Sequence, residues 1–529
     1  MKSKLYALSI AVVVALAGCS LDQEPGGSTI TESQYQEMDN VAEGTIRGVY
    51  PLLYAYGGSH DYFGQRSIDM YGDLCSGDMG MKTQRYGWFT TDEYGRTYTR
   101  RAYFWAFYYD IIRLCNKGIN GIEQQIPSLD FDAETITDEE YSCGYYYAQL
   151  LTLRGWAYAA LQRYFCKMVT SEDIDTELSV PIYTEEITRT DSVLGAPRGT
   201  AADVYLRVEE DLKTAIAYFT AFNQLKRTSK LYVNIDVARM TLAYSYLNKG
   251  AYPEAIQYVE DLLGGTTATV LPNDEVLTNG FNSVESNNWI WGEEVTVNNR
   301  TSLASFFGQC DIYSYSYASA GDIKGIDANL YSEIEKQQWD IREGWWCNYY
   351  NKNKDDKQKN ADTYRYAPDG KFFSAKSTSL SGDRDWLSDN VFMRIELAYL
   401  IGAEAAYRSN DYTNALGYLR HITDERVKQT SEAEGLYESY CDSLAANNVA
   451  LGSAIRYNWR VELWGEGYGL QTFRRWGEAV KLGDNHLRSD KDISPEKVPY
   501  QYTFELPSSE TKYNPYLRST TTLTPSDEN

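Results

Sequence analysis

The sequence is poor in the residues that build catalytic and metal centres. It has only three histidines, and none stands in a pattern typical of catalysis or metal binding. Its eight cysteines are scattered and include no CxxC pair, so neither a disulfide framework nor a zinc site is indicated. After the first twenty residues, no apolar run approaches the roughly 20 residues that span a bilayer. We therefore expect no metal and no cofactor.

Positive charge and phenylalanine are also scarce. The chain has 50 Lys and Arg against 74 Asp and Glu, a formal net charge of −24, which phosphate backbones repel. Nucleic acid is therefore not an expected partner. Only 16 phenylalanines accompany 47 tyrosines and 12 tryptophans. Tyr and Trp combine a large apolar ring with a polar tip, which suits half-exposed sites and wet interfaces. This excess is the main functional signal of the composition.

The amino terminus has the features of a secretory signal. Two lysines precede an apolar run over residues 5–17 that is too short to span a bilayer. The following Leu16-Ala17-Gly18-Cys19 resembles a bacterial lipobox, which implies removal of residues 1–18 and acylation of Cys19. The alternative is an ordinary signal peptide with a chance cysteine. Residues 20–28 are expected to form a tether, and their acidic start resembles the signal that sends lipoproteins of the Bacteroidetes to the outer face of the outer membrane.

Two segments share one helix–turn–helix pattern, residues 238–263 and 398–422. In each, a small residue is followed twelve positions later by another, Ala243 with Ala255 and Ala403 with Ala415, as close packing of two antiparallel helices requires. The spacing resembles the tetratricopeptide repeat. We therefore predict a mainly α fold in which degenerate repeats form a right-handed superhelical frame, with the clearest helix pairs at 201–263 and 392–426.

Other segments fill in this frame. Residues 146–166 and 201–219 have helical spacing and are predicted to form another pair around an insertion containing Val180-Pro181. Residues 33–56 and 102–124 are also predicted to be helical. Between the two clear repeats lie residues 264–391, which are rich in Gly, Asn, Asp, Ser and aromatic residues. Because a structureless loop of that length is improbable in a compact domain, we predict an ordered, irregular insert with short strands.

The order of these features, with two motifs near the end, resembles the SusD/RagB family of outer-membrane glycan-uptake lipoproteins. The first motif is RYNWRVELWGEGYGLQTFRRWG at 456–477 and the second is ELPSSETKYNP at 505–515. Matching positions are Arg456, Arg460, Glu462, Leu463, Glu466, Gly467, Arg475, Trp476 and Gly477. Gly469 and Thr472 depart from it, since the family commonly has Arg and Asp there. The resemblance covers nearly the whole chain and implies one domain over 19–529.

The resemblance also implies a function. Such a protein sits on the cell surface, held in the outer membrane through the lipid on Cys19, and has no catalytic activity. It binds an oligo- or polysaccharide and passes it to a SusC-like TonB-dependent barrel, over which it acts as a hinged lid. The ligand would lie on the large insert and on an early loop at 57–101.

Three stretches are candidates for this glycan site, because sugar rings stack on exposed aromatic rings beside polar groups. Residues 78–89 offer Asp78, Arg85, Tyr86 and Trp88; the alternative is a packed loop with a surface ion pair. In residues 311–318, Tyr313, Tyr315 and Tyr317 would share one face of a strand, either as a sugar platform or as a packing face. Of the adjacent Trp345 and Trp346, one is expected to face outward, and we select Trp345. Trp289 and Trp291 are expected in the core.

Two other functions stay open from the residues alone. A glycoside hydrolase needs two carboxylates at a set separation, and no local motif identifies such a pair. A tetratricopeptide frame is also compatible with a protein-interaction scaffold or a peptide-binding uptake lipoprotein. The acidic stretches at 321–327 and 382–386 match no calcium loop and are expected to be surface turns.

Overall fold

The computed structural model describes residues 41–89, 100–125, 138–184, 195–222, 229–487, 492–494 and 503–517. The described chain is mainly helical, as predicted, and its strands form only two-stranded sheets. Cys19 and the tether at 20–28 lie outside the described residues. None of the described helices is long and apolar enough to cross a bilayer.

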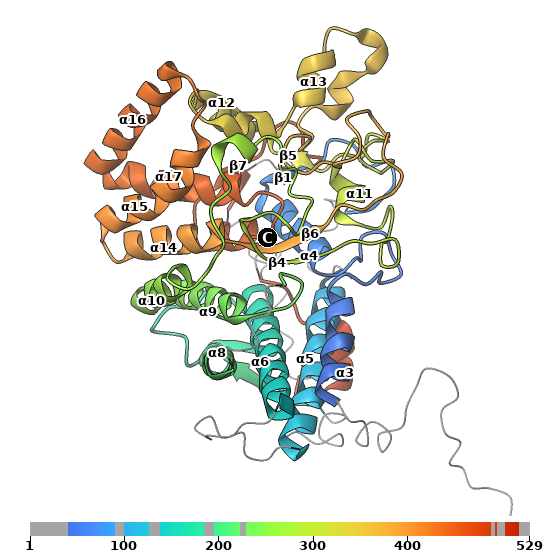
Figure 1. The fold of residues 1–529 in the computed structure, drawn as a ribbon, viewed down its shortest axis with the longest axis vertical. Helices are drawn as coiled ribbons and strands as arrows, with labels where there is room; N and C mark the ends of the chain where they lie inside the picture. The colour runs from blue at the N-terminus through green and yellow to red at the C-terminus, as the bar shows by residue number, and fades with distance from the viewer. Residues whose placement is uncertain are drawn as a thin grey trace, which may run out of the picture.

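One short helix and two long ones lie side by side in the lower part of the molecule in Figure 1. They are α3 (Val41–Val49), α5 (Arg100–Gln125) and α6 (Asp138–Phe165). Helix α6 packs along α8 (Ala201–Ala221), and the intervening segment contains the antiparallel strands β2 (Leu178–Pro181) and β3 (Arg198–Thr200). The predicted helix pair around Val180-Pro181 is therefore confirmed.

The two clear repeats are helix pairs as predicted. The first pair is α9 (Ile235–Lys249) with α10 (Tyr252–Leu263), and the second is α14 (Glu396–Arg408) with α15 (Tyr412–Thr423). The four small residues, Ala243, Ala255, Ala403 and Ala415, are all fully buried. Gly250 ends α9 with a φ of 80°, a left-handed conformation that glycine adopts without strain.

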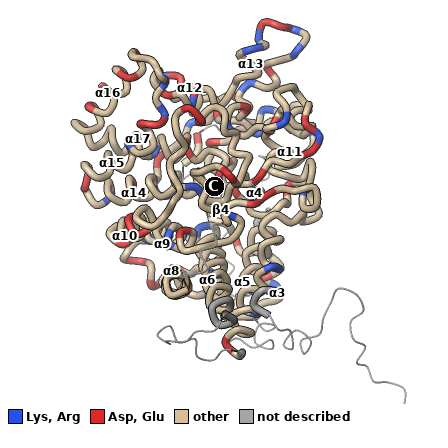
Figure 2. Tube along the Cα trace, viewed as in Figure 1, with Lys and Arg blue, Asp and Glu red and all other residues tan. Residues whose placement is uncertain are grey.

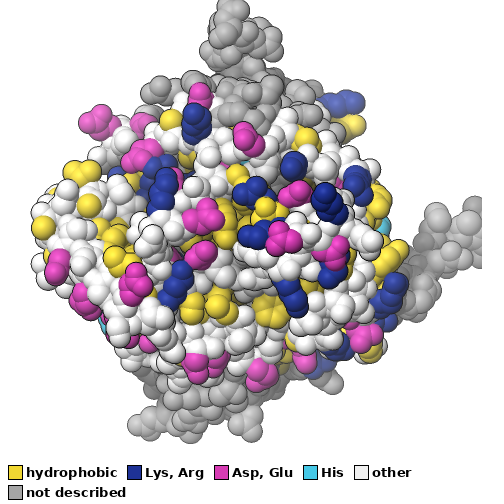
Figure 3. Space-filling model, turned by 90° about the horizontal axis from the view of Figure 1, so that it is seen from above, with side chains coloured by type: hydrophobic (Ala, Val, Ile, Leu, Met, Phe, Trp, Pro, Cys, Tyr) yellow, Lys and Arg dark blue, Asp and Glu magenta, His cyan; other side chains and the backbone are white. Residues whose placement is uncertain are grey.

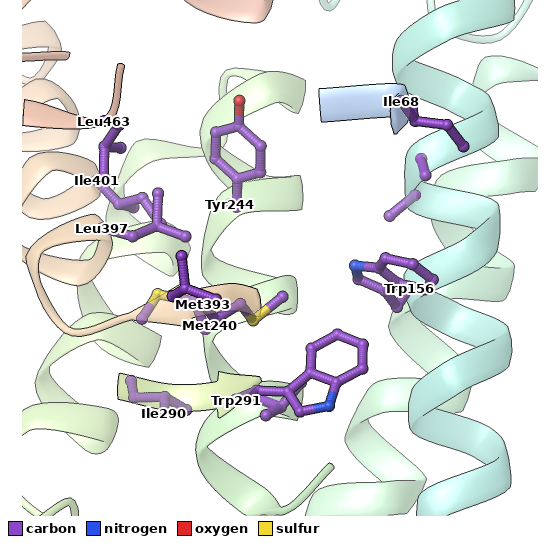
Figure 4. Packing of buried hydrophobic residues seen from close by; sticks show 14 of the residues in the cluster. Ile68, Trp156, Met240, Tyr244, Ile290, Trp291, Met393, Leu397, Ile401 and Leu463 are labelled. Carbon is purple, nitrogen blue, oxygen red and sulfur yellow. The ribbon is translucent and has the colours of Figure 1, made fainter. Parts of the chain in front are cut away.

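The two pairs are neighbours in space although residues 264–391 separate them in the sequence. Helix α10 packs on α14. The insert leaves and returns through strands β4 (Trp289–Glu293) and β6 (Asn390–Arg394), which pair antiparallel. Trp291 of β4 packs edge-on against Trp156 of α6, with ring centroids 5.4 Å apart (Figure 4). Because β4 pairs with β6, the two ends of the insert lie side by side. The second helix pair can therefore pack directly on the first.

The insert itself is built from short elements at the top of Figure 1. They are α11 (Phe306–Cys310), β5 (Gly325–Ile326), α12 (Ala328–Lys336), α13 (Asn348–Asn353) and four 3-10 turns, such as η5 (Ile341–Trp345). The rest of the chain adds α4 (Gln65–Ser76), β1 (Met79–Gly80), α16 (Ser431–Ala446), α17 (Asn448–Glu462), α18 (Gly469–Trp476), β7 (Val480–Lys481), β8 (Asp492–Ile493) and α20 (Ser508–Tyr513). Acidic positions are spread over the outer helices, among them α8, α10 and α16 (Figure 2).

The cysteines described by the structure are buried, as expected for Cys115, Cys143 and Cys166. The stretch 321–327 corrects an expectation, because it is not a surface turn. Asp322 and Lys324 are fully buried, and Lys324 Nζ lies 3.6 Å from Asp322 Oδ2. Asp327 caps α12 by accepting a hydrogen bond from the Leu330 N–H. These acids therefore serve the fold.

A buried ionic network explains the motif at 456–477. Glu462, near the end of α17, contacts three guanidiniums, those of Arg342, Arg394 and Arg426, at 3.0, 2.8 and 2.9 Å. All four side chains are fully buried. Burial acts to raise the pKa of Glu462, but Arg426 and Arg394 hold it well below its usual range. The network joins α17 to η5, to β6 and to the segment after α15, so the motif is an internal tie between repeats and insert.

Candidate ligand-binding surface

The loop after α4 is anchored at its base and free at its tip. Helix α4 ends at Ser76, and β1 then pairs antiparallel with β5 of the insert. The chain continues outward through exposed Arg85 and Tyr86 and returns to the core at Phe89, which is fully buried. Gly87 has a φ of 73°, a left-handed turn that separates Tyr86 from Trp88. The loop thus presents two aromatic side chains from a rigid base.

Five rings from three segments meet at this tip, and we call them the aromatic cluster: Tyr56, His60, Tyr86, Trp88 and Tyr317. His60 stacks on Trp88, with ring centroids 5.3 Å apart and planes inclined by 12°. Tyr317 meets Tyr86 edge-on at 5.0 Å, and Tyr56 meets His60 edge-on at 5.8 Å. The cluster joins the segment after α3, the loop after α4 and the large insert.

The cluster combines exposed ring surface with fixed polar groups. Tyr56 and Tyr86 are each 49% exposed, whereas Tyr317 is 9% exposed. The Tyr317 hydroxyl lies 2.6 Å from His60 Nδ1, and burial raises the pKa of this tyrosine. Arg85 Nη1 donates to the Ala320 carbonyl at 2.8 Å. Flat rings cover the C–H faces of a sugar, and hydroxyl and guanidinium groups bind its hydroxyl rim.

The three tyrosines of 311–318 do not form a ladder, which corrects the predicted strand. The segment is a series of bends, so its tyrosines point to three places. Tyr313 packs against a small core cluster that includes Ile312 and Ile323. Tyr315 is 45% exposed, and Arg384 lies 4.5 Å over its ring. Only Tyr317 reaches the aromatic cluster.

Two other predicted site residues are buried in the fold. Asp78 is 2% exposed and accepts from Arg460 Nε at 2.7 Å, while its carbonyl accepts from Trp464 Nε1. Trp345 is fully buried and donates to the Val276 carbonyl at 2.7 Å. Neither side chain is open to a ligand. Trp346 is also fully buried, so the expectation that one ring of this pair faces outward was wrong.

Sequence reasoning selected Arg85, Tyr86 and Trp88, which the structure brings together, but it missed Tyr56 and His60. Both lie in the stretch YAYGGSH at 54–60, where aromatic residues alternate with small ones outside any helical period. Aromatic residues without helical period also marked residues 78–89 as a candidate, so the same pattern could have identified Tyr56 and His60 from the sequence. Trp289 and Trp291 are buried on β4, as expected.

Comparisons with known proteins agree with this architecture. Residues 21–242 match the family model described as starch-binding associating with outer membrane, and residues 287–525 match that of the SusD family. A search of curated proteins found no match.

Three solved structures with a similar fold come from Bacteroides species. A SusD-like carbohydrate binding protein from Bacteroides vulgatus is 21% identical with a TM-score of 0.69, over 90% of this chain and 96% of that one. A SusD superfamily protein from Bacteroides thetaiotaomicron is 20% identical with a TM-score of 0.69, over 90% and 98%. Surface glycan-binding protein A from Bacteroides thetaiotaomicron, in complex with laminarihexaose, is 15% identical with a TM-score of 0.58, over 91% and 97%.

Proposed function

We propose that this chain, which belongs to the SusD/RagB family, binds an oligo- or polysaccharide through the aromatic cluster. The observation that carries the proposal is the meeting of Tyr56, His60, Tyr86, Trp88 and Tyr317 at one exposed position. A cluster formed only to fill the core would be covered, yet two of its rings are half exposed. Tyr and Trp rings suit a binding site because each supplies a large apolar area and loses little conformational entropy when a ligand binds.

The proposal is for binding without cleavage. General acid–base hydrolysis of a glycoside needs two carboxylates flanking the scissile bond. Two described acids close to the aromatic cluster have partners within the fold, since Asp61 accepts from the Tyr71 hydroxyl and Asp322 lies beside Lys324. An assay for new reducing ends, run on every glycan that binds, is expected to detect none. Release of reducing ends by the wild-type chain would favour the hydrolase instead.

We further propose that the chain delivers its ligand to a SusC-like TonB-dependent transporter at the outer surface of the outer membrane. The proposal rests on family membership and on the lipobox at Cys19, whose acylation would anchor the mature chain. An anchored receptor holds a captured polymer near the transporter at a high effective concentration, without a tight single contact. Closing over the ligand would then be a shift between two populated positions of the lid.

Native affinity electrophoresis tests the binding proposal. The chain lacking residues 1–19 is run through gels that contain laminarin, starch, xylan, galactan or another soluble glycan. We expect one class of glycan to slow the chain, and Trp88→Ala and Tyr86→Ala to abolish that retardation. Tyr86 is half exposed, so its removal leaves the core intact.

Tyr513→Ala is the matched control, because Tyr513 is 71% exposed on α20 and lies outside the cluster. It is expected to bind like the wild type. Retardation that survives both cluster substitutions would place the glycan site elsewhere, and the absence of retardation by any glycan would favour peptide cargo or a scaffold role.

A further inference from the structure

An open groove lies beside the loop that carries Tyr86 and Trp88, and residues of that loop line it. Its volume of about 160 Å³ is smaller than the roughly 300–1,000 Å³ typical of sites for whole small molecules, so it has room for one substituent of a ligand rather than for a whole oligosaccharide. Its described lining comprises Gly80, Lys82, Thr83, Arg85, Ile323, Gly325, Asp362, Thr363, Arg365, Tyr366 and Asn485. Three of these side chains are cationic, and Asp362 is the single carboxylate among them. This is an unusual balance on a chain of net charge −24.

The guanidiniums of the groove are held in place by uncharged groups. Arg85 donates to the Ala320 carbonyl, and Arg365 lies 5.1 and 5.0 Å over the rings of Tyr350 and Tyr366. Rings and carbonyls orient a guanidinium without cancelling its charge. Among the described residues, no ion pair involves Lys82, Arg85 or Arg365. Their charge is therefore available to a ligand.

Of the three acids described here, one is exposed at the rim of the groove and two are buried beside a cationic or histidine side chain. Asp362 is exposed at its rim. Asp322 accepts the backbone N–H of Arg85 at 3.3 Å and lies buried beside Lys324. Asp327 is buried, and its Oδ1 lies 3.0 Å from His486 Nε2. Seen from above, Lys and Arg side chains lie near the middle of this face, mixed with Asp and Glu side chains and with hydrophobic ones (Figure 3).

We infer that this groove binds an anionic substituent, a carboxylate or a sulfate, carried by the glycan that lies on the aromatic cluster. Guanidinium groups bind both anions through two parallel hydrogen bonds. Arg85 and Tyr86 are consecutive, so a sugar chain resting on the cluster can extend over the loop into the groove. The inference rests on the proposed glycan binding and adds the class of glycan, an acidic one.

Matched polymers separate this inference from the proposed function. The probes are glucuronoxylan and its carboxyl-reduced form, polygalacturonate and its carboxyl-reduced form, and chondroitin sulfate and its desulfated form. We expect the wild-type chain to be slowed more strongly by the charged member of at least one pair. A uronate pair and the sulfate pair distinguish the two sources of the anion.

The variant Lys82→Gln/Arg365→Gln is expected to lose about tenfold or more in affinity for that charged polymer, since charge-assisted hydrogen bonds are about twice as strong as neutral ones. Its affinity for the neutral twin should not change. Arg113→Gln/Lys213→Gln removes the same charge from exposed positions on α5 and α8 and should behave like the wild type.

Each other outcome decides between the two claims. Equal binding of both members of every pair overturns the anion inference and leaves the proposed function standing, provided that Trp88→Ala abolishes binding. A preference for charged polymer that the groove variant retains also overturns it. Binding of no polymer at all, charged or neutral, overturns both.

Discussion

The rings of His60 and Trp88 are stacked with centroids 5.3 Å apart, although the two residues come from different loops. The stack joins the segment after α3 to the loop after α4. Tyr317 of the insert joins them as well, because its hydroxyl lies within hydrogen-bond distance of His60 Nδ1. One face of the tryptophan is therefore already occupied by the imidazole. A sugar stacking on Trp88 would use the remaining ring surface, together with Tyr86.

Two substitutions at His60 separate stacking from hydrogen bonding. His60→Phe keeps a ring against Trp88 but removes the partner of the Tyr317 hydroxyl, so we expect a loss of affinity of a few fold. His60→Ala removes both and should weaken binding about tenfold or more, since an aromatic pair contributes about 0.5–1.5 kcal/mol beyond its area. Isothermal titration with the glycan identified by electrophoresis measures both. Equal losses would show that the stack does not orient Trp88.

Glu462 is expected to be essential for stability. Glu462→Gln leaves three buried guanidiniums without their shared carboxylate, and breaking a buried ion pair in this way costs about 3–5 kcal/mol. Urea unfolding followed by circular dichroism measures the loss. Glu438→Gln is the control, because Glu438 is 65% exposed and lies 3.9 Å from Arg420 on the surface. A loss for Glu462→Gln as small as that of the control would contradict the network's role.

Glu293 is expected to make stability fall as pH rises. Burial raises the pKa of its carboxyl from 4.5 to about 8, against the opposing hydrogen bond from Asn390. The folded chain then binds more protons than the unfolded chain between pH 4.5 and about 8, so this group's contribution declines across that window. Glu293→Gln keeps the shape and the Asn390 contact without the charge.

The variant should unfold at the same temperature as the wild type near pH 5 and at a higher one at pH 9. Thermal unfolding from pH 5 to 9 tests this, with Glu285→Gln as the control because Glu285 is exposed in the same segment. Matching pH profiles of Glu293→Gln and the wild type would refute the assignment.

The packing of the second repeat can be tested by enlarging a small residue. Ala403 is fully buried between α14 and its neighbours, so Ala403→Leu should destabilise the chain by about 1–3 kcal/mol through overpacking. Ala445→Leu is the control, since Ala445 is exposed on α16. Urea unfolding of both variants should give a loss only for the first. A neutral Ala403→Leu would mean that the helix contact is looser than the structure has it.

Sequence and fold agree most closely where local rules decide. The helix pairs α9–α10 and α14–α15 follow from apolar spacing, small residues and turn residues that lie close together in the chain. The candidates Arg85, Tyr86 and Trp88 came from a short stretch without helical period. Asp78 and Trp345 looked similar in composition, but burial depends on what covers a side chain, and distant segments provide that cover, among them Arg460 for Asp78 and Val276 for Trp345.

By itself, the sequence determined the class of the fold, the position of its repeats and one loop of the candidate surface, because these depend on periodicity and composition within short windows. Only the tertiary structure decided that α10 packs on α14 across the insert, and that His60, Trp88 and Tyr317 form one cluster. It also decided that Lys82, Arg85 and Arg365 share a groove. These relationships join residues up to several hundred positions apart, and packing of the whole core sets them.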